Sequence, residues 1–147
     1  MIQAPRRVLL VHPELPSTSY WGMQHSVTAL GKRAFMPSLG LLTIAAMFPE
    51  TDELRHLDMN CEPLRDEDIA WADVICFSAM IPQRDSLLAA AARCRLPGKV
   101  VVFGGPYPSA SPDECKAHCD VMVLDEAENV VPALLAPLEK LFGITTD

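Results

Sequence analysis

Four short, unbroken hydrophobic runs are spaced along the chain at intervals that suit strands separated by helices. They cover residues 8–11, 74–77, 100–103 and 121–124. Each run is continuous rather than alternating, which is typical of parallel strands covered on both faces. A fifth and more polar run at residues 54–57 predicts a strand near the edge of the same sheet.

Helical patterns occupy most of the intervals between these runs. Residues 39–48 are apolar nearly all round, which predicts a buried helix packed on the sheet. The segment SPDE at 111–114 is a capping box with proline at the first helical position, so a helix is expected to open at Ser111. Strands that alternate with helices over short connections predict a doubly wound α/β fold, a five-stranded parallel sheet with helices on both faces. The other expected helices cover residues 66–72, 85–95 and 129–141.

One connection, residues 13–37, is too long for this pattern. It opens with proline, serine and threonine at 16–18 and continues into Tyr20-Trp21-Gly22. Connections of this length in compact domains are usually lids or binding loops. An excursion over the surface is the alternative. An exposed tryptophan without a partner is costly, and this favours contact of Trp21 with a ligand or with another domain.

Composition limits the classes of function. The chain has 147 residues, enough for one domain with a substantial core. Its net charge of −7 argues against nucleic acid or an anionic membrane surface as the main partner, and no run approaches the ~20 apolar residues of a membrane span. The first residues lead into a strand pattern rather than a signal peptide. Five cysteines at irregular spacing indicate free thiols in a reducing compartment, so a cytoplasmic protein is expected.

The residues that follow the predicted strands are the candidates for chemistry, because ligands of open α/β sheets bind beyond the carboxyl ends of the strands. No G-x-G-x-x-G motif, P-loop or nucleophile elbow is present. His12 and Ser78 stand where a receiver domain would carry acids. What remains is a floor of small residues that would let a ligand approach the backbone closely: Ser78, Ala79, Gly104 and Gly105. Close packing of helix on strand is the alternative, and it accounts for one glycine better than for the pair.

Five short segments follow one another in an order known from one protein family. They are residues 7–13 (RVLLVHP), 37–43 (PSLGLLT), 78–80 (SAM), 104–106 (GGP) and 126–128 (EAE). In this order and at these strand ends they resemble the N-terminal cobalamin-binding domain of cobalamin-dependent radical S-adenosylmethionine (radical SAM) enzymes. The resemblance is to the branch of hopanoid methylases and related lipid or pigment enzymes, and it spans nearly the whole chain.

The resemblance implies a flavodoxin-like sheet with the corrin ring across its carboxyl edge. The dimethylbenzimidazole nucleotide tail would then lie in a slot between the third and fourth strand ends. Ser78 and Met80 match the family's Ser-x-Leu-like element that lines the tail, and the glycine pair matches its Gly-Gly element. The cobalamin-binding residues that the resemblance implies are His12, Ser38, Leu39, Gly40, Ser78, Ala79, Met80, Gly104, Gly105, Pro106, Tyr107, Glu126, Ala127 and Glu128.

Two departures from the family pattern change what is expected at this edge. Asp125 stands where the Gly-Glu-x-Glu turn usually has glycine. The Asp-x-His-x-x-Gly signature of cobalamin mutases, whose histidine ligates cobalt, is absent, and His12 lacks the carboxylate that normally orients a ligating imidazole. We therefore expect cobalamin with its tail displaced and no protein histidine on cobalt. His12 and His25 are the alternative ligands.

The iron–sulfur motif of radical SAM enzymes, C-x-x-x-C-x-x-C, is also absent. Cys115 and Cys119 have the first spacing, but Met122 takes the third position. Half-buried thiols on one short helix are the preferred interpretation, and a three-ligand metal cluster of Cys115, His118 and Cys119 is the alternative. An iron–sulfur cluster and S-adenosylmethionine are therefore expected only in a C-terminal domain that this chain lacks.

Together these observations predict a single cobalamin-binding domain over residues 1–147, without catalytic machinery of its own. It would hold methylcobalamin for a radical SAM methyltransferase-type domain, either in cis beyond residue 147 or in trans. A flavodoxin-like nucleotide- or flavin-binding domain and a ligand-free interaction domain of the same fold are the alternatives. The first of these would be expected to carry a glycine-rich or acidic first loop, which this chain lacks.

Overall fold

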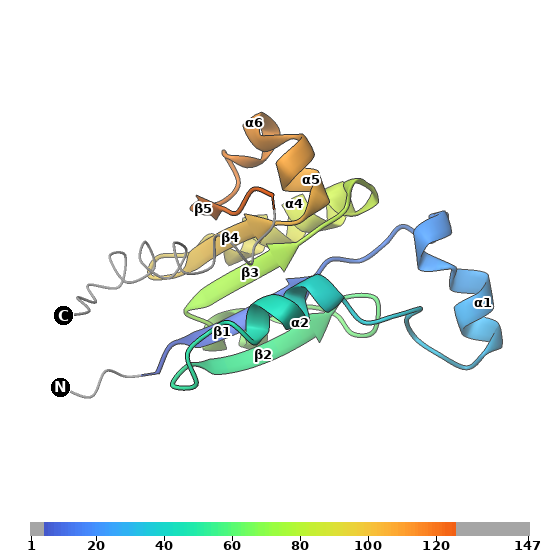
Figure 1. The fold of residues 1–147 in the computed structure, drawn as a ribbon, viewed down its shortest axis with the longest axis horizontal. Coiled ribbons are helices and arrows are strands. Elements are labelled where there is room, and N and C mark those ends of the chain that lie inside the picture. The colour runs from blue at the N-terminus through green and yellow to red at the C-terminus, as the bar shows by residue number, and fades with distance from the viewer. Residues whose placement is uncertain (1–4, 126–147) are drawn as a thin grey trace.

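The computed structural model describes residues 5–125, which contain five strands. They are β1 (Arg7–His12), β2 (Glu53–Asp58), β3 (Val74–Ser78), β4 (Val100–Gly104) and β5 (Val121–Met122). All neighbouring strands are parallel, and their order in the sheet is β2-β1-β3-β4-β5 (Figure 1). This is the doubly wound, five-stranded parallel sheet that the hydrophobic runs predicted and the flavodoxin-like sheet that the resemblance implied, so the predicted fold is confirmed.

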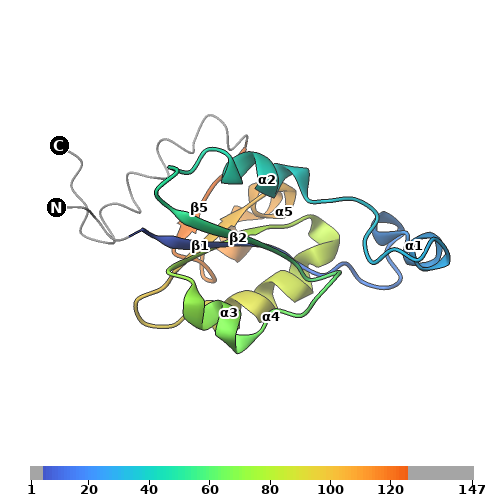
Figure 2. The same ribbon diagram turned by 90° about the horizontal axis from the view of Figure 1, so that it is seen from below.

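Helices connect the strands and cover both faces of the sheet. They are α1 (Gln24–Ala29), α2 (Leu39–Ala45), α3 (Asp66–Trp71), α4 (Arg84–Cys94), α5 (Pro106–Ala110) and α6 (Pro112–Cys115), with 3-10 turns η1 (Tyr20–Gly22) and η2 (Ile81–Gln83). Figure 2 shows α2 on one face of the sheet and α3 and α4 on the other, whereas α1 stands beyond one end of the strands. Between residues 5 and 125, no helix combines the length and the apolar character that a bilayer crossing requires.

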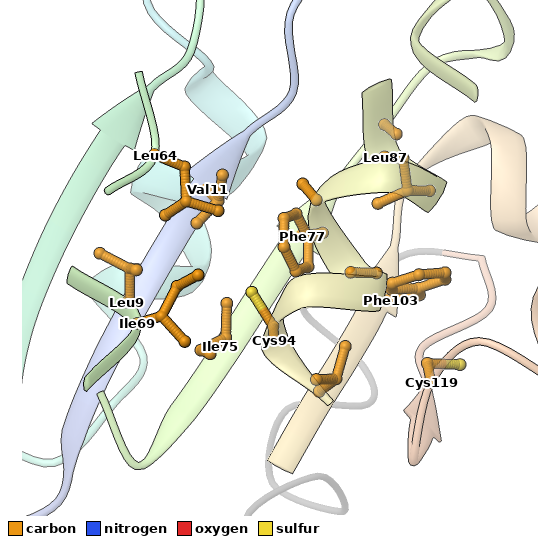
Figure 3. Close-up of a cluster of buried hydrophobic side chains, with 14 of the residues drawn as sticks. Leu9, Val11, Leu64, Ile69, Ile75, Phe77, Leu87, Cys94, Phe103 and Cys119 are labelled. Carbon is orange, nitrogen blue, oxygen red and sulfur yellow. The ribbon is translucent and has the colours of Figure 1, made fainter. Parts of the chain in front are cut away.

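The strands have unbroken hydrophobic sequences because each buries both of its faces. Leu9 and Val11 of β1 belong to the cluster that packs under α3 and α4 (Figure 3). Val8 and Leu10, which alternate with them, belong to the cluster that packs under α2. Full burial of an apolar side chain of this size stabilises a fold by about 1.5–3 kcal/mol, so both layers fix the position of the central strand.

The helix expected over residues 39–48 is shorter and more exposed than predicted. α2 ends at Ala45, and Leu41 is its one buried residue. Leu39 is 63% exposed and Leu42 is 41% exposed. The reason is that α2 packs on the sheet along one side only, so apolar residues on its other sides lie at the surface. Some of this apolar surface borders the site described below.

The last part of the described chain differs from expectation in detail. β5 has two residues where a run of four was expected, and α5 has no counterpart among the expected helices. Ser111 is the N-cap residue of α6, as expected, but its side chain makes no capping hydrogen bond. α5 and α6 both start with proline, which suits a first helical turn because the N–H that it lacks has no partner there. The expected helix at 129–141 lies outside the described residues.

Candidate functional site

A pocket with a volume of about 340 Å³ opens at the carboxyl edge of the sheet, where β1 and β3 are neighbours. The chain leaves β1 for β2 on one side and later returns to β3 on the other side, so the strand order reverses at this point. Ligands of open α/β sheets bind at such a reversal. The walls of the pocket come from the ends of β1, β2 and β3, the start of α2 and the segment 13–37.

Many of the residues singled out from the sequence line this pocket. They are His12, Ser38, Leu39, Gly40, Ser78, Ala79, Met80 and Pro106. These residues come from four separate segments of the chain, and the sheet brings all four to one edge. Gly104, Gly105 and Tyr107 are not part of the lining. Residues 126–128 lie outside the described part of the chain, so their role stays a prediction.

The structure gives Gly105 a role within the fold. Its φ is +94°, in the region that glycine adopts readily and other residues rarely do. A Cβ atom at this position would lie 2.7 Å from the Ser78 Oγ atom and 3.0 Å from the backbone N and O atoms of Ala79. At Gly104 the nearest atoms, both of Val123, would be 3.7 Å away, an ordinary contact. Glycine is therefore required at 105 by the neighbouring strand end, and at 104 it is not.

Two other groups of candidate residues are buried away from the pocket. The Tyr107 side chain lies in the core cluster under α4 together with Cys115, so only its backbone could reach a ligand at the edge. Cys115 and Cys119 are both buried, and burial raises the pKa of both thiols. Across residues 5–125, no three His, Cys, Asp or Glu side chains converge as metal ligands. The alternative cluster of Cys115, His118 and Cys119 has no support in this arrangement.

The long connection forms one wall of the pocket. Trp21, Phe35 and Met36 of this segment line it, and so does Leu39 at the start of α2. All four side chains are between 57% and 63% exposed, and we refer to them as the apolar rim. Contiguous apolar surface of this kind is typical of binding or interaction sites. Trp21 is thus placed at the pocket, and its contact with a ligand or another domain stays a prediction.

The polar side of the pocket includes the end of β2. Asp58 Oδ1 accepts hydrogen bonds from the backbone N–H of Asn60 (2.9 Å) and from its Nδ2 atom (2.7 Å). The same Asn60 amide donates to the Pro13 carbonyl at 3.3 Å and accepts from the Leu15 N–H at 2.9 Å. These bonds fix the loop after β1 to the end of β2. Neither Asp58 nor Asn60 was singled out from the sequence.

Gln83, at the end of η2, is the other polar residue that the sequence analysis missed. Its side chain is fully buried and lines the pocket. Its Oε1 atom accepts from the Met80 N–H at 2.8 Å, and its Nε2 atom lies 2.5 Å from the Pro13 carbonyl oxygen and 3.2 Å from the His12 Nε2 atom. The one available signal was its position, a polar residue five beyond the end of a buried strand at the ligand-binding edge.

The His12 ring lies between β2 and β3 at the end of β1, and its pKa is lowered. Burial is the main cause, and the nearby His56 ring acts in the same direction. The Asp58 carboxylate and a backbone hydrogen bond with Ser78 oppose the shift. Because the net direction is downward from an ordinary value near 6.5, His12 is neutral at physiological pH.

Comparison with known proteins links this chain to a cobalamin-binding family. The family model of the B12 binding domain matches residues 30–135. The chain is 38% identical to a hopanoid C-2 methylase of Rhodopseudomonas palustris over 137 residues, which are 92% of this chain and 26% of that protein. It is 33% identical to an uncharacterised methyltransferase of Synechocystis sp. over 135 residues, 91% of this chain and 25% of the relative.

A more distant relative is the bacteriochlorophyllide d C-12(1)-methyltransferase of Chlorobaculum tepidum, 24% identical over 92 residues (63% of this chain, 20% of that protein). The chain therefore spans about a quarter or less of the length of these curated relatives. The matched range 30–135 covers most of the chain and includes α2 and the ends of β2 and β3 that line the pocket, whereas the end of β1 precedes it. The resemblance seen in the strand-end segments is confirmed, and the chain belongs to the B12-binding domain family.

Proposed function

We propose that this domain binds cobalamin across the carboxyl edge of its sheet, with the nucleotide tail displaced from cobalt and no protein histidine on the metal. We further propose that it serves a radical SAM methyltransferase-type enzyme. The observation that carries the proposal is the pocket at the β1–β3 reversal, lined by Ser78, Ala79 and Met80, in a chain whose family binds B12.

The size and lining of the pocket fit part of this cofactor. A volume of about 340 Å³ is at the lower end of the range for small-molecule sites, and cobalamin is much larger than that. The pocket is therefore suited to one arm of the cofactor, while the corrin ring would spread over the exposed side chains of the apolar rim. Gly40 supports this arrangement, because it lines the pocket and a Cβ atom there would meet no other atom within 4 Å.

The residues of the chain would position the cofactor and shield it, and cobalamin itself supplies the methyl-carrying cobalt when it is bound. Ser38 and Ser78 would offer hydroxyl groups to the amide side chains of the corrin, since both line the pocket. The backbone after β3 would contact the nucleotide arm. His12 would remain a wall of the site, because its Nε2 atom lies 3.2 Å from the Gln83 amide nitrogen.

The partner that uses the cofactor is proposed from the length of the relatives. Two of them have names that state a methylation of a specific compound, and the present chain matches only 26% of one and 20% of the other. The rest of such a protein, in cis or in trans, would hold an iron–sulfur cluster and S-adenosylmethionine. The side chains of the apolar rim are 57% to 63% exposed. The corrin would cover them on one side, and the rest of the enzyme would pack against the other side of the corrin.

Reconstitution with hydroxocobalamin followed by gel filtration tests the proposal. We expect the protein peak to carry the absorbance of bound cobalamin, with a spectrum that shows the tail displaced. Gly40→Trp should remove at least nine-tenths of the bound cofactor, because the indole would fill the open space beside the pocket. Ala92→Trp, at an exposed position on α4 outside the pocket, is the matched control and should retain it. A colourless wild-type peak would contradict cobalamin binding, and retention of FMN instead would favour the flavin alternative.

A further inference from the structure

Gln83 is a fully buried polar residue, with 0% of its surface exposed. It lies in η2, between the end of β3 and the start of α4. A buried amide without hydrogen bonds costs free energy, so a glutamine in this position requires partners for both ends of its amide group. Its partners are two backbone groups and one imidazole.

The two backbone groups fix which end of the amide is which. The Met80 N–H can only donate, so the atom 2.8 Å from it is the amide oxygen. The Pro13 carbonyl can only accept, so the atom 2.5 Å from it is the amide nitrogen. The assignment of Gln83 Oε1 and Nε2 thus follows from the backbone on either side and does not depend on the imidazole.

The amide orientation then fixes the tautomer of His12. The Gln83 Nε2 atom lies 3.2 Å from the His12 Nε2 atom and has one remaining proton to donate. A hydrogen bond between these two nitrogens requires a lone pair on the imidazole nitrogen, so the ring proton is on Nδ1.

We propose that Gln83 is a positioning residue that holds His12 as the neutral Nδ1–H tautomer with its Nε2 lone pair occupied. His12 is the one histidine in the lining of the pocket. With this lone pair engaged, the pocket offers no imidazole to a metal centre brought to the edge of the sheet. The part of the inference that concerns a metal centre rests on the proposed function, whereas the tautomer does not.

The charged groups around His12 act in both directions. Asp58, from the end of β2, favours the imidazolium ion, while His56 of the same strand and burial of the ring disfavour it. Arg33, from the long connection, also lines the pocket. From η2 the group that faces the ring is the Gln83 amide, and it opposes protonation because an imidazolium would place two N–H donors against each other.

Nitrogen-15 NMR of the four histidine rings in the full chain tests the tautomer directly. His12→Asn identifies the His12 signals by their loss. For the wild-type protein we expect a proton on Nδ1, an unprotonated Nε2 and a titration midpoint below the ordinary histidine range. A proton on Nε2 in the neutral wild-type ring would overturn the proposal, whatever the outcome for any variant.

Variants separate the role of the amide from that of general packing. Gln83→Glu keeps the shape and the bond from the Met80 N–H but replaces the donor by a carboxylate oxygen, so the His12 midpoint should move to higher pH and Nε2 should gain its proton. Gln24→Glu is the matched control, because Gln24 lines the same pocket without bonding to His12. It should leave the tautomer unchanged. Equal effects of the two substitutions would contradict a specific role of Gln83.

Diaquocobinamide, a corrin without the nucleotide base, tests the consequence for metal ligation. The wild-type protein should produce no imidazole-ligated spectrum, whereas Gln83→Leu should produce one that His12→Asn in the same background removes. Imidazole ligation by wild-type His12 would overturn the inference and leave cobalamin binding intact. Failure of the wild-type protein to retain cobalamin would instead count against the proposed function, and the NMR result would still decide the tautomer.

Discussion

Replacement of Gly105 by alanine tests whether this glycine serves the fold. The residue combines a φ of +94° with a ψ of −177°, a conformation that is almost restricted to glycine. An added methyl group would lie 2.7 Å from the Ser78 Oγ atom and 3.0 Å from two backbone atoms of Ala79. The hydroxyl could rotate away, but the backbone of Ala79 is held by a hydrogen bond from its N–H to the Gly104 carbonyl. The contact with the Ala79 backbone therefore cannot be relieved without breaking this hydrogen bond or shifting the strand end.

The expected loss of stability has two parts. A residue forced into a sparsely populated backbone region costs about 1–3 kcal/mol. Overpacking of a methyl group against fixed neighbours costs about another 1–3 kcal/mol. Gly105→Ala should therefore lower the free energy of unfolding by about 2–6 kcal/mol, a large share of the roughly 5–15 kcal/mol that a domain of this kind possesses.

Alanine substitutions at three other glycines separate the cost of backbone strain from the cost of overpacking. Gly31 has a φ of +64° but no atom within 4 Å of an added Cβ, so Gly31→Ala should cost only the strain, about 1–2 kcal/mol. Gly104→Ala meets ordinary contacts at 3.7 Å and should be nearly neutral. Gly40→Ala lies inside α2 in open space and should stabilise the helix by up to about 1 kcal/mol.

Urea denaturation followed by far-ultraviolet circular dichroism measures these differences. With m-values of about 1–3 kcal/mol/M for small proteins, the loss expected for Gly105→Ala lowers the urea midpoint by roughly 0.7 M or more. The order of stability should be Gly40→Ala, Gly104→Ala, Gly31→Ala and then Gly105→Ala. If Gly105→Ala is as stable as Gly104→Ala, the close approach to Ser78 and Ala79 does not constrain the fold, and the argument is refuted.

Other side chains give predictions of known sign. Arg6 and Asp52 form a salt bridge at 2.7 Å, and their side chains are only 11% and 4% exposed. Arg6→Ala leaves the Asp52 charge buried without its partner, so it should lower the free energy of unfolding in urea by about 3–5 kcal/mol. The double variant Arg6→Met/Asp52→Leu should recover most of that loss. The hydrogen bond from Arg7 lowers the pKa of Asp73. The stabilisation of the fold by the ionised Asp73 is therefore present above about pH 4 and is lost as the pH falls further. The difference in free energy of unfolding between the wild type and Asp73→Asn should accordingly shrink on acidification. Phe103→Ala removes a fully buried ring that contacts Phe77 edge-on and should cost about 3–5 kcal/mol in the same assay.

The sheet was predictable because strand burial leaves a direct record in the sequence. Alternate residues of β1 pack on opposite faces, so every position must be apolar, and the run from Val8 to Val11 shows this without any tertiary information. α2 was predicted less well for a related reason. Its apolar residues satisfy two requirements, Leu41 against the sheet and Leu39 at the pocket, and a hydrophobic pattern does not distinguish a core from an apolar binding surface.

The site was predictable as a place and only partly as a set of residues. The rule that ligands bind at strand ends brought out Ser78 and its neighbours, which do line the pocket. Gln83 and Asn60 were missed because their partners are backbone groups of the loop after β1, about 70 and 47 residues away in the chain. No local pattern records such a bond. The sequence indicated that some group lies close to the backbone of Gly105 and suggested a ligand. In the structure that group is the end of β3, at Ser78 and Ala79.

The loop after β1 shows how the pocket obtains a defined shape. Pro13 has no N–H, so its carbonyl is the one backbone group at that residue able to form a hydrogen bond. Asn60, from beyond β2, donates to this oxygen at 3.3 Å, and Gln83, from beyond β3, donates to it at 2.5 Å. The segments after three adjacent strands are thereby joined at a single atom. A site fixed in this way before a ligand arrives loses less conformational entropy on binding. The sequence directs attention to the imidazole of His12, whereas the neighbouring carbonyl is the group that holds the edge together.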